Sequence, residues 1–178
     1  MSVYHYTTQQ RLPIIKAAGY LRPSVAYPTP GEKMALWFTI SNEWDNTANK
    51  GMPALHEGKI VSVTLNPRMT HHLTGGLVRV ECADSVAPYD WDWYKLHSGV
   101  HRKMARHLYQ TAILQGVKPR DWRVTFERVP CEAWTAVHFW DGDQWTLDRP
   151  TVELPDPKEI DQVIQDQIRL GRFTVPAQ

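Results

Sequence analysis

The chain has 178 residues, 42% of them hydrophobic and 22% charged, and its formal net charge is +1 at pH 7. These are ordinary globular values, which exclude disordered, collagen-like and coiled-coil proteins. The small net charge also excludes a strongly basic nucleic-acid-binding class and leaves only a local basic patch for such a partner. The length corresponds to a single domain over residues 1–178.

The first half of the chain predicts one helix among several strands. A β-branched and aromatic run predicts a strand over residues 3–6, and Thr7 or Thr8 then caps a helix that Gly19 ends. Apolar or alternating runs predict three further strands, over residues 35–39, 59–65 and 77–82.

The second half begins with a predicted helix and continues with strands. Apolar residues at helical spacing predict a helix over residues 101–114. Residues 120–129 are expected to contain a strand, and residues 134–140 and 144–147 to form a hairpin across Asp141-Gly142.

The final helix has the clearest signals in the chain. Asp156 is a predicted N-cap, Pro157 occupies the first helical position, and an apolar stripe runs from Ile160 to Ile168. Helices and strands do not alternate regularly along the chain, so the fold class is expected to be α+β. No GxGxxG or GxxxxGK[ST] motif is present, which disfavours a Rossmann site and a P-loop.

Cysteine and histidine usage predicts neither a disulfide framework nor a metal site. Cys82 and Cys131 form no CxxC pair, and the adjacent side chains of His71 and His72 point apart on an extended chain. The start of the chain has no signal-peptide pattern, and no run approaches 18 apolar residues. We therefore expect a cytoplasmic protein with no membrane contact, and the sequence leaves the oligomeric state open.

Two short segments of the chain stand out together. The first is Tyr4-His5-Tyr6-Thr7, and the second is Ala35-Leu36-Trp37-Phe38-Thr39 followed by Asp45-Asn46-Thr47-Ala48-Asn49-Lys50. A histidine at a strand end can bond a sugar hydroxyl, and an aromatic strand can stack on a flat ring and exclude water.

These segments resemble the motifs of the diphtheria-toxin-like ADP-ribosyltransferases, a superfamily that includes poly-ADP-ribose polymerases, DarT-type DNA modifiers and RNA 2′-phosphotransferases. His5 and Thr7 match its strand-borne His-x-Thr, and the second segment matches its aromatic strand and the helix start that follows. Trp37 stands where the polymerase-like members have tyrosine. The resemblance covers residues 1–50 and implies an ADP-ribosyltransferase-like split β-sheet core with flanking helices and NAD as a substrate.

The resemblance also implies roles for particular residues. Cofactor binding is expected from His5, Tyr6, Thr7, Trp37, Phe38 and Thr47, with His5 also serving catalysis. The superfamily's catalytic glutamate lies on a late strand. Glu127 is preferred because it lies within a predicted strand, Glu132 opens the next strand, and Glu81 ranks third.

The expected function is an NAD-dependent mono-ADP-ribosyltransferase, a glycosyl-transferring enzyme that modifies a protein or nucleic-acid acceptor, such as a toxin, defence or phage factor. The alternatives are a non-catalytic binding or inhibitory module that keeps the fold, and an RNA 2′-phosphotransferase. Residues 90–94 are expected to be an irregular surface loop. A basic helix face is expected to be solvated, or to contact a nucleic-acid acceptor: His101, Arg102, Lys103, Arg106 and His107.

Overall fold

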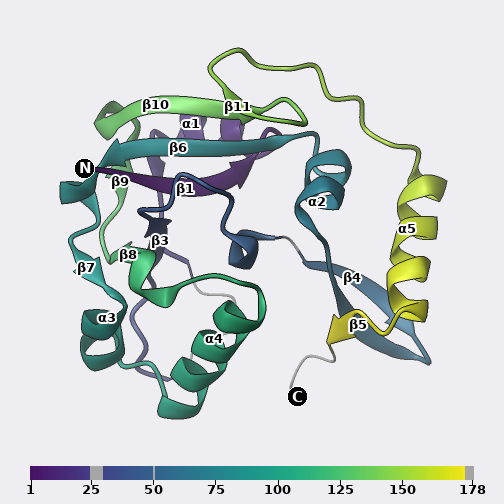
Figure 1. Ribbon diagram of the computed structural model, residues 1–178, viewed down its shortest axis with the longest axis horizontal. Coiled ribbons are helices and arrows are strands. Elements are labelled where there is room, and N and C mark those ends of the chain that lie inside the picture. Colours follow the sequence, from purple (N-terminus) through teal and green to yellow (C-terminus); the bar gives the residue numbers. More distant parts are fainter. Residues whose placement is uncertain (25–29, 50, 175–178) are drawn as a thin grey trace.

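A seven-stranded antiparallel sheet forms the larger part of the molecule in the computed structural model, which describes residues 1–24, 30–49 and 51–174 (Figure 1). Lys50, the last residue of the second motif, lies outside the described residues. The strand order is β11-β10-β6-β1-β3-β8-β7. The strands are β1 (Ser2–Thr8), β3 (Leu36–Thr39), β6 (Leu77–Ala83), β7 (Tyr89–Asp90), β8 (Trp122–Thr125), β10 (Trp134–Trp140) and β11 (Trp145–Thr146).

Helices lie on both sides of this sheet. Leu12 of α1 (Leu12–Ala18) packs against Val78 and Phe139, so α1 covers one face of the β6 and β10 strands. The helices α3 (Trp91–His97) and α4 (Arg102–Leu114) lie together beyond β8, and their apolar faces share a core with Val124 (Figure 1).

A smaller unit of sheet and helix has its own apolar core. The strands β4 (Gly51–His56), β5 (Lys59–Thr64) and β12 (Phe173–Thr174) form a three-stranded sheet in the order β12-β5-β4. The helices α2 (Pro67–Leu73) and α5 (Pro157–Arg169) pack on it. The strands β2 (Tyr20–Leu21) and β9 (Val129–Pro130) form a separate two-stranded pair. The remaining described elements are four short 3₁₀ helices: η1 (Asn46–Ala48), η2 (Asp84–Val86), η3 (Pro119–Asp121) and η4 (Cys131–Ala133).

The mixture of helices and antiparallel sheets confirms the α+β class, and most predicted elements are present. One helix cap and one loop were predicted wrongly. No threonine caps α1, because β1 continues through Thr8 and Arg11 precedes the helix without a side-chain cap. Residues 90–94 are not an irregular loop, because the Asp90 side chain accepts a hydrogen bond from the Trp93 amide and so starts α3.

The turn between α3 and α4 depends on Gly99. Its φ is +78°, and a Cβ placed there would lie 2.6 Å from the Gly31 carbonyl oxygen. Gly116 has a similar φ of +74°, but a Cβ there would meet open space. Gly116→Ala should therefore cost only the left-handed backbone strain, about 1 kcal/mol. Gly99→Ala should lower the free energy of unfolding by about 1–2 kcal/mol more, because backbone must move. Urea unfolding of both variants measures this difference, and equal losses would contradict the close approach.

Candidate active site

The strands β1 and β3 separate almost as soon as they meet. Their register contains a single pair, Tyr4 opposite Thr39, whereas β1 pairs with β6 along its full length. A continued antiparallel register would place Tyr6 opposite Trp37. Instead the His5 Nδ1 atom lies 2.8 Å from the Trp37 carbonyl oxygen. A carbonyl only accepts, so the proton of the neutral imidazole is on Nδ1, and Nε2 carries the lone pair.

A cavity of about 450 Å³ opens at this separation. It is a suitable size for a small-molecule or cofactor site, for which about 300–1,000 Å³ is usual. The separated strands supply Tyr4, His5 and Tyr6 from β1 and Trp37, Phe38 and Thr39 from β3. The two sequence motifs thus meet at one cavity, although more than 30 residues separate them.

Aromatic side chains hold Trp37 in place within the wall of the cavity. The Trp37 ring centroid lies 4.6 Å from that of Tyr94 and 5.4 Å from that of Trp122, both in edge-to-face geometry. Met104 and Leu108, one turn apart on α4, continue this wall. The lining is therefore rigid and largely apolar, as the stacking of a flat ring requires.

The buried carboxylate of Asp45 anchors the loop that follows β3. It accepts hydrogen bonds from the Thr47 amide at 2.8 Å and from the Trp122 indole N–H at 2.8 Å, and the Thr47 hydroxyl donates to it as well. Asp45 is 7% exposed, so these donors balance the cost of burying its charge. Thr47 is brought to the cavity by this cap, while both carboxylate oxygens of Asp45 are engaged in holding the loop.

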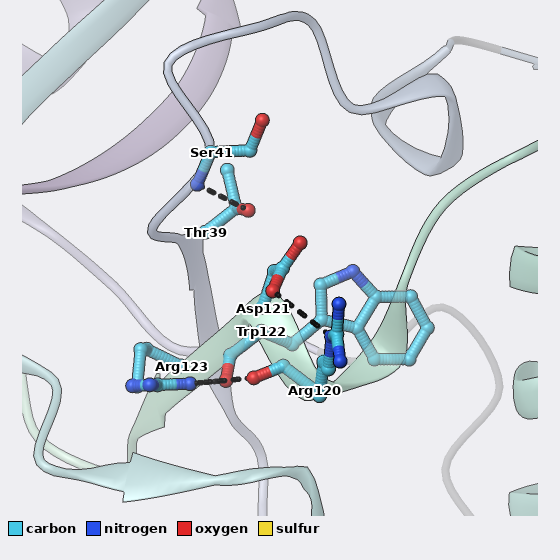
Figure 2. Close-up of polar contacts among 6 residues, drawn as sticks. All are labelled: Thr39, Ser41, Arg120, Asp121, Trp122 and Arg123. Carbon is cyan, nitrogen blue, oxygen red and sulfur yellow. Dashed lines mark hydrogen bonds and ion pairs between the residues drawn. The ribbon is translucent and has the colours of Figure 1, made fainter.

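The ends of β3 and β8 at the cavity edge are fixed by local polar contacts (Figure 2). The Thr39 hydroxyl accepts a hydrogen bond from the Ser41 amide at 3.1 Å, which turns the chain at the end of β3. The Arg123 guanidinium donates to the Arg120 carbonyl at 2.9 Å and so ties the start of β8 to η3. Thr39 pairs with Trp122 across these strand ends, and both residues line the cavity.

Glu32 and Gln115 add further polar groups to the cavity. The Tyr94 hydroxyl donates to Glu32 at 2.7 Å, and burial together with this carboxylate raises the pKa of Tyr94. The Gln115 Oε1 atom is buried and has no hydrogen-bond partner in the part of the chain that the structure describes. Because an unpaired buried acceptor is costly, it suits a ligand that supplies an N–H donor.

Five of the predicted binding residues line the cavity: His5, Tyr6, Trp37, Phe38 and Thr47. Thr7 is not among the lining residues; it is buried in β1 opposite Val78. The Tyr6 hydroxyl donates to the Glu43 carbonyl, and burial raises the pKa of Tyr6. The ring of Phe38 lies 5.6 Å from that of His5 and belongs to the main core, so its contribution to the site is to support the imidazole.

The strand placement predicted for Glu127 is wrong. The strand β8 ends at Thr125, whose hydroxyl accepts a hydrogen bond from the Glu127 amide and turns the chain outward. Glu132 lies in η4, just before β10. Both glutamates are exposed, and neither is among the residues that line the cavity.

Glu81, the third-ranked glutamate, belongs to a separate polar cluster on β6. The Ser2 hydroxyl donates to it at 2.6 Å and His138 Nε2 lies 2.9 Å away, and these bonds hold the pKa of Glu81 below its ordinary value. Because the folded-state pKa is lowered, Glu81 stabilises the fold above its unfolded-state pKa, and this stability is lost as the pH falls through the folded-state value.

Removing the serine hydroxyl should weaken this dependence on pH. We expect Ser2→Ala to flatten the loss of unfolding free energy between about pH 5 and pH 3, since the hydroxyl is the largest cause of the lowered pKa. Ser85→Ala, which changes an exposed serine in η2, is the matched control. Guanidinium unfolding at several pH values measures the effect, and identical curves for the two variants would contradict it.

The adjacent histidines of α2 have structural partners. His72 lies 2.9 Å from a carboxylate oxygen of Glu159 on α5, and His71 Nδ1 accepts a hydrogen bond from the Leu77 amide. Burial lowers the pKa of His71. Across residues 1–24, 30–49 and 51–174, no three His, Cys, Asp or Glu side chains group as a metal site would need.

Comparison with protein-family models, with curated proteins and with solved structures gives no match. Within the same described ranges, every helix is too short or too polar to cross a bilayer.

Proposed function

We propose that the chain binds NAD in the cavity between β1 and β3 and transfers ADP-ribose to a macromolecular acceptor. One observation carries the proposal: the motif residues His5, Trp37 and Thr47 surround one cavity where the sheet splits. The position of the split supports an ADP-ribosyltransferase-like core with flanking helices.

The proposed chemistry requires a site that holds a sugar while positive charge develops on it. Cleavage of nicotinamide from NAD passes through an oxocarbenium-like ribose. The lone pair on His5 Nε2 can accept a hydrogen bond from a ribose hydroxyl, and the half-buried Trp37 can stack on a flat ring. The Gln115 Oε1 atom can accept from the carboxamide of nicotinamide or from the amino group of adenine.

A carboxylate near the developing charge would stabilise the transition state. Among the described lining residues, Glu32 and Asp45 carry carboxylates. Both carboxylate oxygens of Asp45 already hold Thr47 and Trp122, and Glu32 lines the same cavity at a half-buried position. We therefore assign Glu32 the transition-state role, and Glu127 and Glu132 remain candidates to be compared with it.

The direct test is release of nicotinamide from NAD by the purified protein, with protein, DNA and RNA offered separately as acceptors. The proposal predicts that the unmodified protein releases nicotinamide faster than a His5→Ala variant does. It also predicts that the acceptor becomes labelled when the NAD carries a label in its adenosine. Release at the uncatalysed rate with every acceptor would refute the transferase.

A binding module without transfer is the second candidate, and one observation favours it. The predicted catalytic glutamates, Glu127 and Glu132, lie outside the cavity lining. Such a module would bind NAD without releasing nicotinamide. We do not propose an RNA 2′-phosphotransferase, because that reaction needs several arginines around a phosphate and the described lining residues include none.

A further inference from the structure

The near-neutral charge of the chain conceals a strongly positive segment. Residues 93–120 contain six Lys and Arg, three His, and neither Asp nor Glu. Since the whole chain has 20 Lys and Arg against 19 Asp and Glu, the other residues carry 14 basic against 19 acidic side chains. The positive segment comprises the end of α3, all of α4 and nearly all of η3.

The outer face of α4 displays this charge without compensation. Arg102, Lys103 and Arg106 are exposed, and no ion pair joins them to any residue that the structure describes. Positive side chains in the first turn of a helix oppose the helix dipole, and this first turn has no acidic residue. Helix stability therefore does not account for the charge, whereas a negatively charged partner would.

A column of stacked aromatic rings on β7 and α3 ends at His97, five residues before the first basic residue of α4. The ring of Tyr89 stacks on that of Trp93 with centroids 3.8 Å apart, and Trp93 stacks on His97 at 4.1 Å. His97 is exposed at one end of the column, and its imidazole bonds the Trp93 carbonyl at 2.9 Å, which fixes the ring. The acidic residues at the other end are engaged, Asp90 as the N-cap of α3 and Asp92 with Lys95.

We propose that single-stranded nucleic acid binds across α3 and α4. Phosphates contact Arg102, Lys103 and Arg106, and an unpaired base stacks on His97. A duplex fits less well, because its bases are already stacked on one another. Since α4 also forms a wall of the cavity, the bound strand lies within about one helix diameter, ~10 Å, of it. The bound strand would then be the acceptor of ADP-ribose. This role rests on the proposed function, whereas the binding of the strand is independent of it.

Fluorescence anisotropy in the absence of NAD tests the binding surface. The probes are a labelled DNA strand of about 20 nucleotides, the same sequence as RNA, and the DNA duplex. The triple variant R102Q/K103Q/R106Q should bind both single strands at least ~10-fold more weakly at low salt, with the slope of log K against log salt reduced by about 2. The matched control K16Q/K59Q/R68Q removes the same charge from exposed positions on α1, β5 and α2 and should bind as the unmodified protein does.

Replacement of the stacking ring tests the preference for single strands. His97→Ala should weaken single-strand binding by about 10-fold and leave duplex binding unchanged, while His72→Ala should change neither. Any of three results would overturn the proposal. The two triple variants could bind with equal affinity, the duplex could bind more tightly than the single strands, or the protein could bind anionic phospholipid vesicles in place of the strands. The DNA and RNA arms identify the nucleic acid. Because no NAD is present, failure here leaves the proposed NAD site untouched, and failure of NAD turnover leaves this surface untouched.

Discussion

Replacement of Glu32 by glutamine should lower the rate of nicotinamide release from NAD by about 10²-fold or more. Glutamine keeps the shape of the side chain and can still accept the Tyr94 hydrogen bond, so the variant removes little besides the charge. An interaction made mainly in the transition state affects the rate more than ground-state affinity, so NAD binding should change little. Steady-state release assays and calorimetry on the same protein measure the two quantities.

The corresponding glutamine variants of Glu127 and Glu132 serve as comparisons. Both residues are exposed and outside the cavity lining, so each variant should retain most of the activity. Loss of nicotinamide release in either variant, with activity preserved in Glu32→Gln, would show that the assignment of the carboxylate is wrong. If Glu132 is the residue whose variant loses activity, the catalytic strand begins after Pro130.

Replacement of Asp45 by alanine should lower the free energy of unfolding by about 3 kcal/mol, because the Thr47 amide and the Trp122 indole N–H would remain as unpaired donors. The loop that carries Thr47 to the cavity would lose its anchor as well. Chemical unfolding measures the loss, with Asp148→Ala, an exposed position on the loop after β11, as the matched control. A loss below about 0.5 kcal/mol, typical of surface changes, would contradict the role given to Asp45.

Local sequence patterns predicted most of the sheet but not where each strand stops. Alternating and apolar runs located β1, β3, β5, β6 and β10, because burial of one face makes every second residue apolar and burial of both faces gives a continuous apolar run. The end of β8 was missed, because the run around Glu127 continues to look like a strand. The Thr125 hydroxyl turns the chain by bonding the Glu127 amide, and threonine is equally common inside strands.

Sequence motifs predicted the cavity residues that lie within them, but not the cavity residues that only tertiary packing brings to the site. His5 and Trp37 lie in recognisable segments and do meet at the cavity. Glu32 and Gln115 reach it from a loop after a proline-rich stretch and from the residue after α4, and no spacing in the sequence connects them. Asp45 had a usable signal, since an aspartate two residues before Thr47 at a helix start is an N-cap pattern.

Titration calorimetry of NAD into the unmodified protein, His5→Ala and His72→Ala tests most directly the central claim that the β1–β3 cavity binds NAD. We predict micromolar to millimolar binding by the unmodified protein, or about −4 to −8 kcal/mol. His5→Ala should weaken binding by about 1–3 kcal/mol, because a buried ribose hydroxyl loses its hydrogen-bond partner. His72→Ala, at a surface position on α2, should bind as the unmodified protein does. Absence of binding heat, or equal affinity in His5→Ala and His72→Ala, would contradict the claim.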